Sequence, residues 1–245
     1  MVTGAGQGIG LAICRQAIAL GAKTVGVDLN PDTLAQAAEE LGDDFLAVAG
    51  SVSDADFAPI AVQQTLEHFG ALDGLVNNAG ITRPAMITKM TEEKWQTVID
   101  VNMSGTLYFT QAVGAHMLER AESGETGPGA IVNISSDAGR RGSLGQINYA
   151  AAKAGVFGMT MTAAREWAAS GIRCNAVCFG VVETPMTEFV RTDERFRDKY
   201  LEQIPLGRWS SAEEVSVPVC FLLSEGASYI TGQVISVNGG FTISM

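Results

Sequence analysis

The alternation of short apolar runs with amphipathic stretches along the whole chain predicts an α/β fold, because strands that alternate with helices favour a parallel sheet covered on both faces. Two further observations support this fold class. A glycine-rich turn follows the first apolar run at 3–10, and the acidic residue Asp28 ends the second run. No repeat, low-complexity tract or linker divides the 245 residues. We therefore expect a single domain over 1–245 with a Rossmann-like, doubly wound parallel sheet.

The apolar runs and the helical periodicities give the order of the elements. Six strands are predicted at 24–27, 45–48, 72–77, 130–134, 173–177 and 234–237, and six helices at 9–20, 31–41, 54–69, 91–118, 149–169 and 212–223. Residues 122–129, rich in Gly, Ser and Thr, are expected to form a surface loop. Only Met1 and Val2 precede the first turn, although strands commonly have about five residues. Either the sequence starts short of a longer first strand, or a stub is held by pairing on both sides.

The net charge of -11 argues against a nucleic-acid partner, because no Lys- or Arg-rich stripe could neutralise phosphates. No apolar stretch approaches the roughly 20 residues of a membrane span, and the start lacks the charged and apolar regions of a signal peptide. With 47% hydrophobic residues, the chain can bury a large core. We therefore expect a soluble, cytoplasmic protein with neither a membrane nor a nucleic-acid partner.

The cysteines and histidines predict neither disulfides nor a metal centre. Four cysteines stand in apolar surroundings without a C-x-x-C pair, which favours buried, reduced thiols: Cys14, Cys174, Cys178 and Cys220. Only His68 and His116 are present, both within helical patterns. His68 stands at a predicted helix C-terminus, where a cation is mildly favourable. A metal site built on imidazoles and a Ser-His-Asp hydrolase are therefore not expected.

Tyr149 and Lys153 have the most informative spacing in the sequence. Residues four apart on a helix lie on one face, so the phenol and the ammonium can share one small volume. Two unit charges about 4 Å apart attract by roughly 4 kcal/mol at an effective dielectric constant of about 20. That attraction equals about three pKa units and predicts that Lys153 lowers the pKa of Tyr149 toward neutrality. A phenol poised in this way can transfer protons, although Tyr-x-x-x-Lys alone also occurs on solvated helix faces.

The turn at 3–10 has the glycine spacing Gly-x-x-x-Gly-x-Gly and opens a predicted helix. Glycines let the backbone approach a pyrophosphate, and free N–H groups at the helix N-terminus supply donors. A plain strand-to-helix turn is the alternative. Asp28 ends the next strand, where a carboxylate can accept hydrogen bonds from the adenosine ribose and would repel a 2′-phosphate. No basic residue follows Asp28, so NAD(H) is favoured over NADP(H). Asp28 could instead cap a helix, a role that Asp32 could also fill.

Together with two further motifs, the glycine turn makes the chain resemble a short-chain dehydrogenase/reductase from Val2 essentially to its end. These motifs are Asn77-Asn78-Ala79-Gly80, after a predicted strand, and the set Asn102, Ser136, Tyr149 and Lys153. The resemblance implies that Tyr149 is the general acid and base, which exchanges a proton with the substrate oxygen as hydride moves to or from a nicotinamide. It also implies that Lys153 stabilises the phenolate and binds the nicotinamide ribose, that Ser136 donates to the same oxygen, and that Asn102 positions a water beside Lys153.

The resemblance also implies a complete cofactor site, expected to hold NAD, and no metal. The expected contacts are Gly4, Gln7, Gly8, Ile9, Gly10, Asp28, Leu29, Ser51, Val52, Asn78, Ala79, Gly80, Tyr149, Lys153, Gly180, Val182 and Thr184. Two positions depart from the family pattern. Ser51-Val52 replaces an Asp-Val pair that holds the adenine, and Phe179-Gly180 replaces a Pro-Gly turn beside the nicotinamide. Thr184, which precedes Pro185, matches the position that holds the carboxamide.

The stretches 78–83, 229–233 and 237–240 are most similar to the branch that contains 3-oxoacyl-acyl-carrier-protein reductases and acetoacetyl-CoA reductases. A 3-oxoacyl thioester is therefore the first substrate expected, with Ser136, Gln146 and Tyr149 as its contacts. Arg83, Arg140 and Arg141 could meet a thioester phosphate. Two alternatives stay open: an NAD-dependent dehydrogenase of a polyol, steroid or other cyclic secondary alcohol, and a non-catalytic nucleotide-sensing scaffold.

Substrate choice is expected to lie in 137–148 and 184–208, on the open side of the crevice. The helical pattern of 184–208, with Phe189, Phe196, Tyr200 and Leu201, predicts a mobile lid. A surface helix packed on its own core is the alternative.

The predicted helices at 91–118 and 149–169 contain small residues that permit close helix packing: Gly105, Ala112, Gly155, Gly158 and Ala163. Members of the resembled family assemble as tetramers through these two helices. A homotetramer is therefore expected.

Overall fold

A computed structural model describes residues 1–243, and it contains a seven-stranded sheet in which every pair of neighbouring strands is parallel. The strands lie in the order β3-β2-β1-β4-β5-β6-β7. Their bounds are β1 Val2–Thr3, β2 Thr24–Asp28, β3 Phe45–Ala49, β4 Gly74–Asn77, β5 Ala130–Ser136, β6 Arg173–Phe179 and β7 Val234–Val237. Strand order reverses between β1 and β4, so the predicted doubly wound α/β fold is confirmed.

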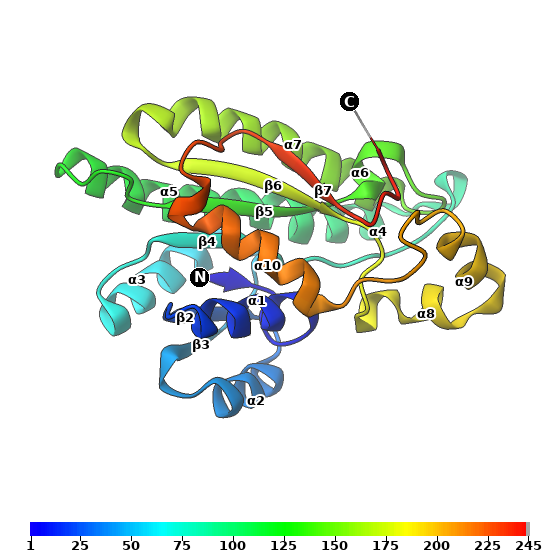
Figure 1. Cartoon of the computed structure of the whole chain (residues 1–245), viewed down its shortest axis with the longest axis horizontal. Coiled ribbons are helices and arrows are strands. Elements are labelled where there is room, and N and C mark those ends of the chain that lie inside the picture. Colours follow the sequence, from blue (N-terminus) through cyan, green and yellow to red (C-terminus); the bar gives the residue numbers. More distant parts are fainter. Residues whose placement is uncertain (244–245) are drawn as a thin grey trace.

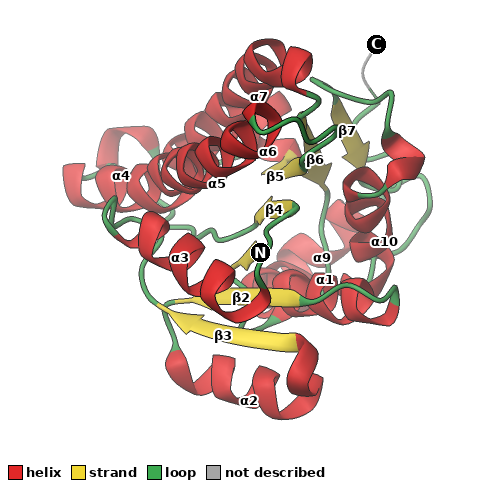
Figure 2. Ribbon diagram, turned by 90° about the vertical axis from the view of Figure 1, so that its left-hand side faces the viewer, coloured by secondary structure: helices red, strands yellow, loops and turns green. Residues whose placement is uncertain are grey.

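Helices cover both faces of this sheet (Figure 2). Their bounds are α1 Gly8–Ala19, α2 Pro31–Leu41, α3 Phe57–Phe69, α4 Glu92–Ile99, α5 Gly105–Glu122, α6 Asp137–Arg141, α7 Ile147–Trp167, α8 Glu188–Thr192, α9 Glu194–Leu201 and α10 Ala212–Leu223. One apolar cluster joins the sheet to α1, α2 and α10, and includes Ile13, Leu34 and Val219. A second cluster joins the other face to α3, α5 and α7, and includes Phe109 and Met117.

The first strand is a stub of two residues that pairs on both sides. Val2 pairs with Gly26 of β2 and Val76 of β4. The Thr3 hydroxyl accepts hydrogen bonds from the backbone N–H groups of Asn78 and Ala79, each at 3.0 Å. These contacts hold the short strand at the centre of the sheet, where the chain order reverses.

The prediction of one continuous helix over 91–118 is wrong. The structure has α4, then a π-helical segment Asp100–Ser104, and then α5, which runs on to Glu122. A π turn inserts an extra residue into the helix and shifts the faces of the flanking turns relative to each other. Asn102 lies in this segment and is fully buried.

Two other predicted boundaries move for local reasons. The helix predicted from residue 54 begins at Phe57, because the Asp54 carboxylate accepts from the Asp56 N–H and forms a turn. The helix predicted at 149–169 begins at Ile147 and ends at Trp167. Residues 123–129 form the expected surface loop, and His68 stands in the last turn of α3 as predicted.

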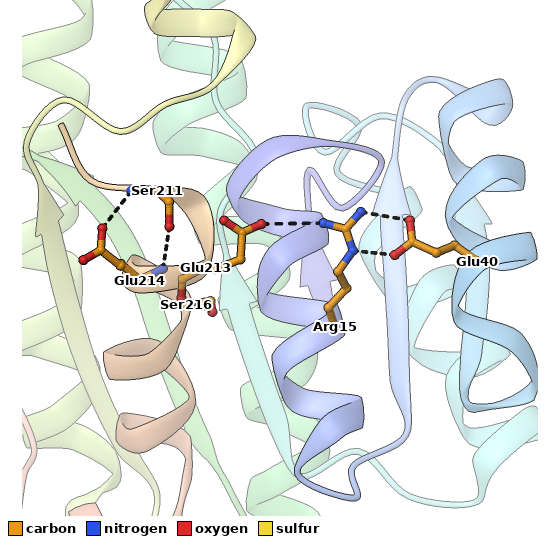
Figure 3. A network of polar contacts seen from close by, with 6 residues as sticks. All are labelled: Arg15, Glu40, Ser211, Glu213, Glu214 and Ser216. Carbon is orange, nitrogen blue, oxygen red and sulfur yellow. Dashed lines mark hydrogen bonds and ion pairs between the residues drawn. The ribbon is translucent and has the colours of Figure 1, made fainter.

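Arg15 ties three helices together at the surface (Figure 3). From α1 its guanidinium pairs with Glu40 of α2 in two hydrogen bonds and lies 3.9 Å from a Glu213 oxygen of α10. Beside it, Ser211 and Glu214 form a capping box at the start of α10. The side chains in this ion-pair network are exposed, so each pair contributes at most about 1 kcal/mol.

The four cysteines are buried and free, as predicted. Within residues 1–243, no helix has the length and apolar character that crossing a membrane requires.

Candidate active site

A cavity of about 950 Å³ runs across the carboxyl ends of β1, β2, β4, β5 and β6. It lies where strand order reverses, the place at which open α/β sheets bind ligands. The glycine turn and Asp28 line one end, and Ser136, Tyr149 and residues of 184–208 line the other. We name these the cofactor end and the substrate end.

Most of the predicted site residues line this cavity. They are Gly4, Gln7, Gly8, Ile9, Asp28, Leu29, Ser51, Val52, Asn78, Ala79, Gly80, Ser136, Gln146, Tyr149, Lys153, Gly180, Val182 and Thr184. Gly10 and Asn102 are not in its wall, because each lies one layer behind it.

The glycine turn leaves the start of α1 open to the cavity. Gln7 is the N-cap residue of α1 but makes no side-chain capping hydrogen bond, so the first N–H groups of the helix are free to bind an anion. Gly8 has φ +57°, a conformation that favours glycine. A Cβ at Gly10 would lie 2.0 Å from the Gly4 carbonyl oxygen. The glycines therefore serve the close approach of backbone to backbone and leave space for a pyrophosphate.

The Asp28 carboxylate is held in place at the end of β2. One oxygen accepts from the Gly6 N–H at 2.9 Å, and the other accepts from the Asn30 N–H at 3.1 Å. Neither Asp28 nor Asp32 caps α2, because Asn30 fills that role by accepting from Asp32 and Thr33. Since a carboxylate has about four acceptor positions, Asp28 keeps capacity for two ribose hydroxyls.

Asn78 fixes the edge of the cavity at the crossing from β1 to β4. Its side-chain amide donates to the carbonyl oxygens of Thr3, at 2.9 Å, and Gly4, at 3.1 Å. The Asn77-Asn78-Ala79-Gly80 motif thereby locks the glycine turn to β4, a structural role that its sequence alone does not reveal.

Ser51 and Phe179, the two positions that depart from the family pattern, both line the cavity. The Ser51 hydroxyl hydrogen-bonds to the Ser53 hydroxyl at 2.8 Å, and Ser53 also lines the cavity. Phe179 is buried in the core and packs beside Gly180. A Cβ at Gly180 would lie 3.0 Å from the Cβ of Asn238, so the backbone remains close-packed without the proline.

Ser136 and Tyr149 meet at the substrate end of the cavity. Ser136 ends β5, and its hydroxyl accepts from the Ala138 N–H at 3.2 Å, which caps α6. Burial raises the pKa of the Tyr149 phenol, while a hydrogen bond with the Ser136 side chain acts in the opposite direction. The phenol is therefore protonated at neutral pH and can give a proton to an oxygen held between the two hydroxyl groups.

Lys153 shares one helix face with Tyr149, as the spacing predicts, and its Nζ lies 5.7 Å from the centre of the tyrosine ring. Nζ donates to the Ile134 carbonyl at 2.8 Å, and burial lowers the pKa of Lys153 to about 8. The prediction that the Lys153 charge lowers the pKa of Tyr149 is wrong for this structure. Burial disfavours both charged forms, and at Tyr149 it is the Ser136 hydrogen bond, not the Lys153 charge, that acts against it.

Asn102 stands behind Gly80 and faces toward Lys153. Its amide nitrogen donates to the carbonyl oxygens of Val98 and Ile81, whereas its Oδ1 is buried without a partner. A Cβ at Gly80 would lie 2.7 Å from this Oδ1 and 3.5 Å from the Lys153 Nζ. Gly80 therefore keeps open the space between an unpaired acceptor and the ammonium.

The substrate end includes residues of both predicted substrate segments, 137–148 and 184–208, and also Phe241, which the sequence did not single out. Arg141, Phe241 and Tyr200 line it together with Gln146. Arg83 also lines the cavity, but Arg140 does not: it donates to the Val234 carbonyl and lies over the Phe157 ring. Asp137, the first residue of the predicted segment 137–148, also lines the cavity and is a buried carboxylate that follows Ser136 directly.

The small residues predicted for a subunit interface are mostly used within the chain. A Cβ at Gly105 would lie 2.9 Å from Val52, and one at Gly155 would lie 2.7 Å from the Met103 sulfur. Ala163 is buried and Ala112 half-buried. Of the three glycines, only Gly158 faces open space.

No group of three or more His, Cys, Asp and Glu side chains within residues 1–243 is arranged to hold a metal ion.

Comparison with known proteins places the chain among reductases. A family model described as "Enoyl-(Acyl carrier protein) reductase" matches residues 4–242. The chain is 43% identical to the 3-oxoacyl-[acyl-carrier-protein] reductase FabG of Thermotoga maritima, over 99% of this chain and 97% of that protein. It is 41% identical to the 3-oxoacyl-[acyl-carrier-protein] reductase of Synechocystis sp., over 99% and 96% of the two chains. It is also 44% identical to an uncharacterized oxidoreductase of Mycobacterium bovis, over 98% and 95%.

Proposed function

The chain belongs to the short-chain dehydrogenase/reductase family and is an NAD(P)-dependent oxidoreductase, and we propose that it reduces 3-oxoacyl thioesters with NADH. The observation that carries the proposal is the meeting of Ser136, Tyr149 and Lys153 in one cavity with an open helix N-terminus and Asp28. A bound nicotinamide would supply the hydride to the carbonyl carbon. The residues of this chain would orient the carbonyl and supply the proton to its oxygen.

Tyr149 is the proton donor in this proposal, and Ser136 is the second donor to the carbonyl oxygen. A preorganised hydroxyl pair stabilises the negative charge that develops on an oxygen as hydride arrives at the neighbouring carbon. The product is a secondary alcohol, with the new C–H bond from hydride and the O–H bond from Tyr149. Lys153 stabilises the resulting phenolate, and Asn102 offers its free Oδ1 to a water that reaches Lys153.

The preference for NAD(H) rests on charge at the cofactor end. The described cations in the cavity wall are Arg83, Arg141 and Lys153. All three belong to the other end: the Arg83 carbonyl accepts from Asn148, next to Tyr149, and Arg141 ends α6. A 2′-phosphate near Asp28 would therefore meet a carboxylate and no cation, which favours the unphosphorylated cofactor.

The thioester substrate is supported by the names of the relatives in Thermotoga maritima and Synechocystis sp., both 3-oxoacyl-[acyl-carrier-protein] reductases. The proposal includes a cytoplasmic homotetramer in which α5 and α7 meet their copies. The exposed Leu107 and Met161 and the open Gly158 on these helices support that assembly. Sedimentation equilibrium measures it, and a monomer would contradict it.

Steady-state assays test the reaction. In the reductive direction, the purified protein is assayed with NADH or NADPH and either a 3-oxoacyl thioester or an enoyl thioester. In the oxidative direction, it is assayed with NAD⁺ and either a polyol or a cyclic secondary alcohol. We expect turnover of the 3-oxoacyl thioester with NADH at a kcat/KM at least tenfold above every other combination. The enoyl thioester is included because the matching family model is described as an enoyl reductase, and such an enzyme reduces a C=C bond instead of a carbonyl group. Absence of 3-oxoacyl turnover would contradict the proposed substrate.

A further inference from the structure

The substrate end is bounded by an aromatic contact between three segments that are remote in the sequence. The Phe241 ring stacks on Tyr200 of α9, with ring centres 5.9 Å apart and planes inclined by 28°. The Arg141 guanidinium of α6 lies 3.7 Å from the centre of the same ring. All three side chains line the cavity. Figure 1 shows α6, α9 and the C-terminal segment on the same side of the molecule.

The backbone of 238–242 fixes the position of Phe241. The Phe241 N–H donates to the Asn238 carbonyl at 3.1 Å, and the Gly240 N–H donates to the Asn238 side-chain oxygen at 3.0 Å. Gly239 and Gly240 have φ +66° and +88°. A Cβ at Gly240 would lie 2.8 Å from Pro205. The turn is therefore tight and packs directly on the chain that follows α9.

Asp137 joins this turn to the reaction centre. The Asn238 side-chain amide donates to the buried Asp137 carboxylate at 2.8 Å, and Asp137 follows Ser136 directly. The same amide also donates to the Thr242 carbonyl at 3.2 Å. Phe241 is thereby held at a set position relative to the Ser136 hydroxyl, through one side-chain hydrogen bond and a short stretch of backbone.

Two further hydrogen bonds connect the surroundings of Phe241 to 184–208. The Arg141 guanidinium donates to the Gln203 side chain at 3.2 Å, and the Leu206 N–H donates to the Gly239 carbonyl at 3.1 Å. Phe189 and Phe196, in contrast, contact each other and do not line the cavity. The aromatic residues of 184–208 thus have separate tasks, and Tyr200 is the one that faces the substrate end.

From these contacts we propose that Phe241 is a specificity-determining residue, whose ring closes the substrate end and limits the length of the acyl group on the reacting carbonyl. The inference rests on the proposed function for the identity of the acyl substrate. The carbonyl oxygen is held at Ser136 and Tyr149, so an acyl chain that extends from it meets a wall placed at a fixed distance. Shorter chains fit against the ring, and longer chains collide with it.

The test compares substrates that differ only in chain length. Phe241→Ala is assayed with NADH and the 3-oxobutanoyl and 3-oxooctanoyl thioesters of N-acetylcysteamine. We expect the ratio of kcat/KM for the eight-carbon over the four-carbon substrate to rise at least tenfold above that of the wild type. Phe241→Leu, which keeps an apolar wall, should raise the ratio less. Phe189→Ala is the matched control on an exposed aromatic residue and should leave the ratio unchanged.

Two outcomes would overturn the inference. One is a ratio within twofold of wild type in Phe241→Ala. The other is an equal loss for both substrates, because that loss indicates a structural role. NADH binding and a thermal melt show whether each variant is folded. If Phe241→Ala is unfolded, Phe241→Leu replaces it, and a ratio less than threefold above that of the wild type would overturn the inference. If the wild type turns over no thioester, the proposed substrate is wrong, but the inference about Phe241 can still be tested. The ratio of kcat/KM for a long over a short substrate is then measured with linear ketones or secondary alcohols of increasing length.

Discussion

At the cofactor end of the cavity the backbone of a glycine turn forms part of the wall, whereas at the substrate end side chains from segments far apart in the chain meet. The turn at 3–10 approaches its neighbours so closely that a methyl group at Gly10 would collide with Gly4. Arg141, Tyr200 and Phe241 instead meet through their side chains. This difference indicates that the glycine turn tolerates almost no added side chain, whereas positions whose side chains line the cavity can change its ligand preference by single substitutions.

The largest effect on folding is expected from Gly10→Ala. The added Cβ would lie 2.0 Å from the Gly4 carbonyl oxygen and 2.7 Å from the Asn78 amide, so backbone must move. We expect a loss of about 3 kcal/mol or more of unfolding free energy, together with loss of NADH binding. Urea unfolding and cofactor fluorescence measure the two effects.

Gly74→Ala is the matched control for this prediction, because its Cβ would lie 3.4 Å from Leu223, an ordinary contact. That variant should stay within about 1 kcal/mol of wild type. Equal stability of the two variants would contradict the claim that a methyl group at Gly10 destabilises the fold more than one at an ordinary packing position.

The next effect concerns Lys153, at the substrate end of the cavity. Burial lowers its pKa to about 8, so in the free enzyme the ammonium is present below pH 8 and is lost above it. We expect kcat/KM for the reduction to fall about tenfold per pH unit above pH 8, since Lys153 supports proton transfer in its charged form. A flat profile from pH 7 to 10 would contradict this role.

The buried ammonium also has a measurable cost in stability. Its pKa is about 8 when folded against a reference value of 10.5, so the unfolded chain binds more protons between these values and stability rises with pH across that window. Below pH 8 the cost is about 3 kcal/mol. Lys153→Met removes that cost and loses a hydrogen bond worth about 1 kcal/mol.

We therefore expect Lys153→Met to be inactive yet about 2 kcal/mol more stable at pH 7, with no gain at pH 10, where the remaining cost of about 1 kcal/mol is offset by the lost hydrogen bond. Urea unfolding at both pH values measures it. A variant that is less stable than wild type at pH 7 would show that the ammonium stabilises the fold.

A smaller effect is expected from Asp28→Asn at the cofactor end. The amide keeps the size of the side chain but removes the charge that repels a 2′-phosphate. We expect the preference for NADH over NADPH, as the ratio of dissociation constants, to fall about tenfold, or about 1.4 kcal/mol. Asp32→Asn, an exposed carboxylate nearby, is the control and should leave the ratio unchanged. An unchanged ratio in Asp28→Asn would refute the charge argument.

The smallest effect is expected from Arg15→Ala, which lies outside both ends. Its ion pairs with Glu40 and Glu213 join α1 to α2 and α10, and the side chains are 42%, 45% and 69% exposed. We expect a change below about 1 kcal/mol in unfolding free energy and none in kcat. A loss of several kcal/mol would show that the surface network, and not the backbone wall, stabilises the cofactor half.

The same difference between the two ends explains which features the sequence revealed. The fold, the glycine turn, Asp28 and the Tyr149–Lys153 face follow from short-range spacing, and the structure brings them to one cavity. The π segment that contains Asn102 has no signature in helical periodicity, because one inserted residue barely alters the apolar pattern. Nor does spacing connect Asp137 with Asn238, or Tyr200 with Phe241, since these pairs form only when the chain is folded. The pKa of Tyr149 was misjudged because pair attraction was counted without the cost of burial.

The most direct test of the central claim is the turnover of Tyr149→Phe, which removes one hydroxyl from the site and leaves the ring that Lys153 contacts. With the substrate that the wild type reduces best, we expect kcat to fall at least about a thousandfold, within the range typical of general acid–base groups. The dissociation constant for NADH, measured by fluorescence, should stay within threefold of the wild-type value. A kcat within tenfold of wild type at unchanged NADH affinity would contradict the assignment of Tyr149 as the proton donor.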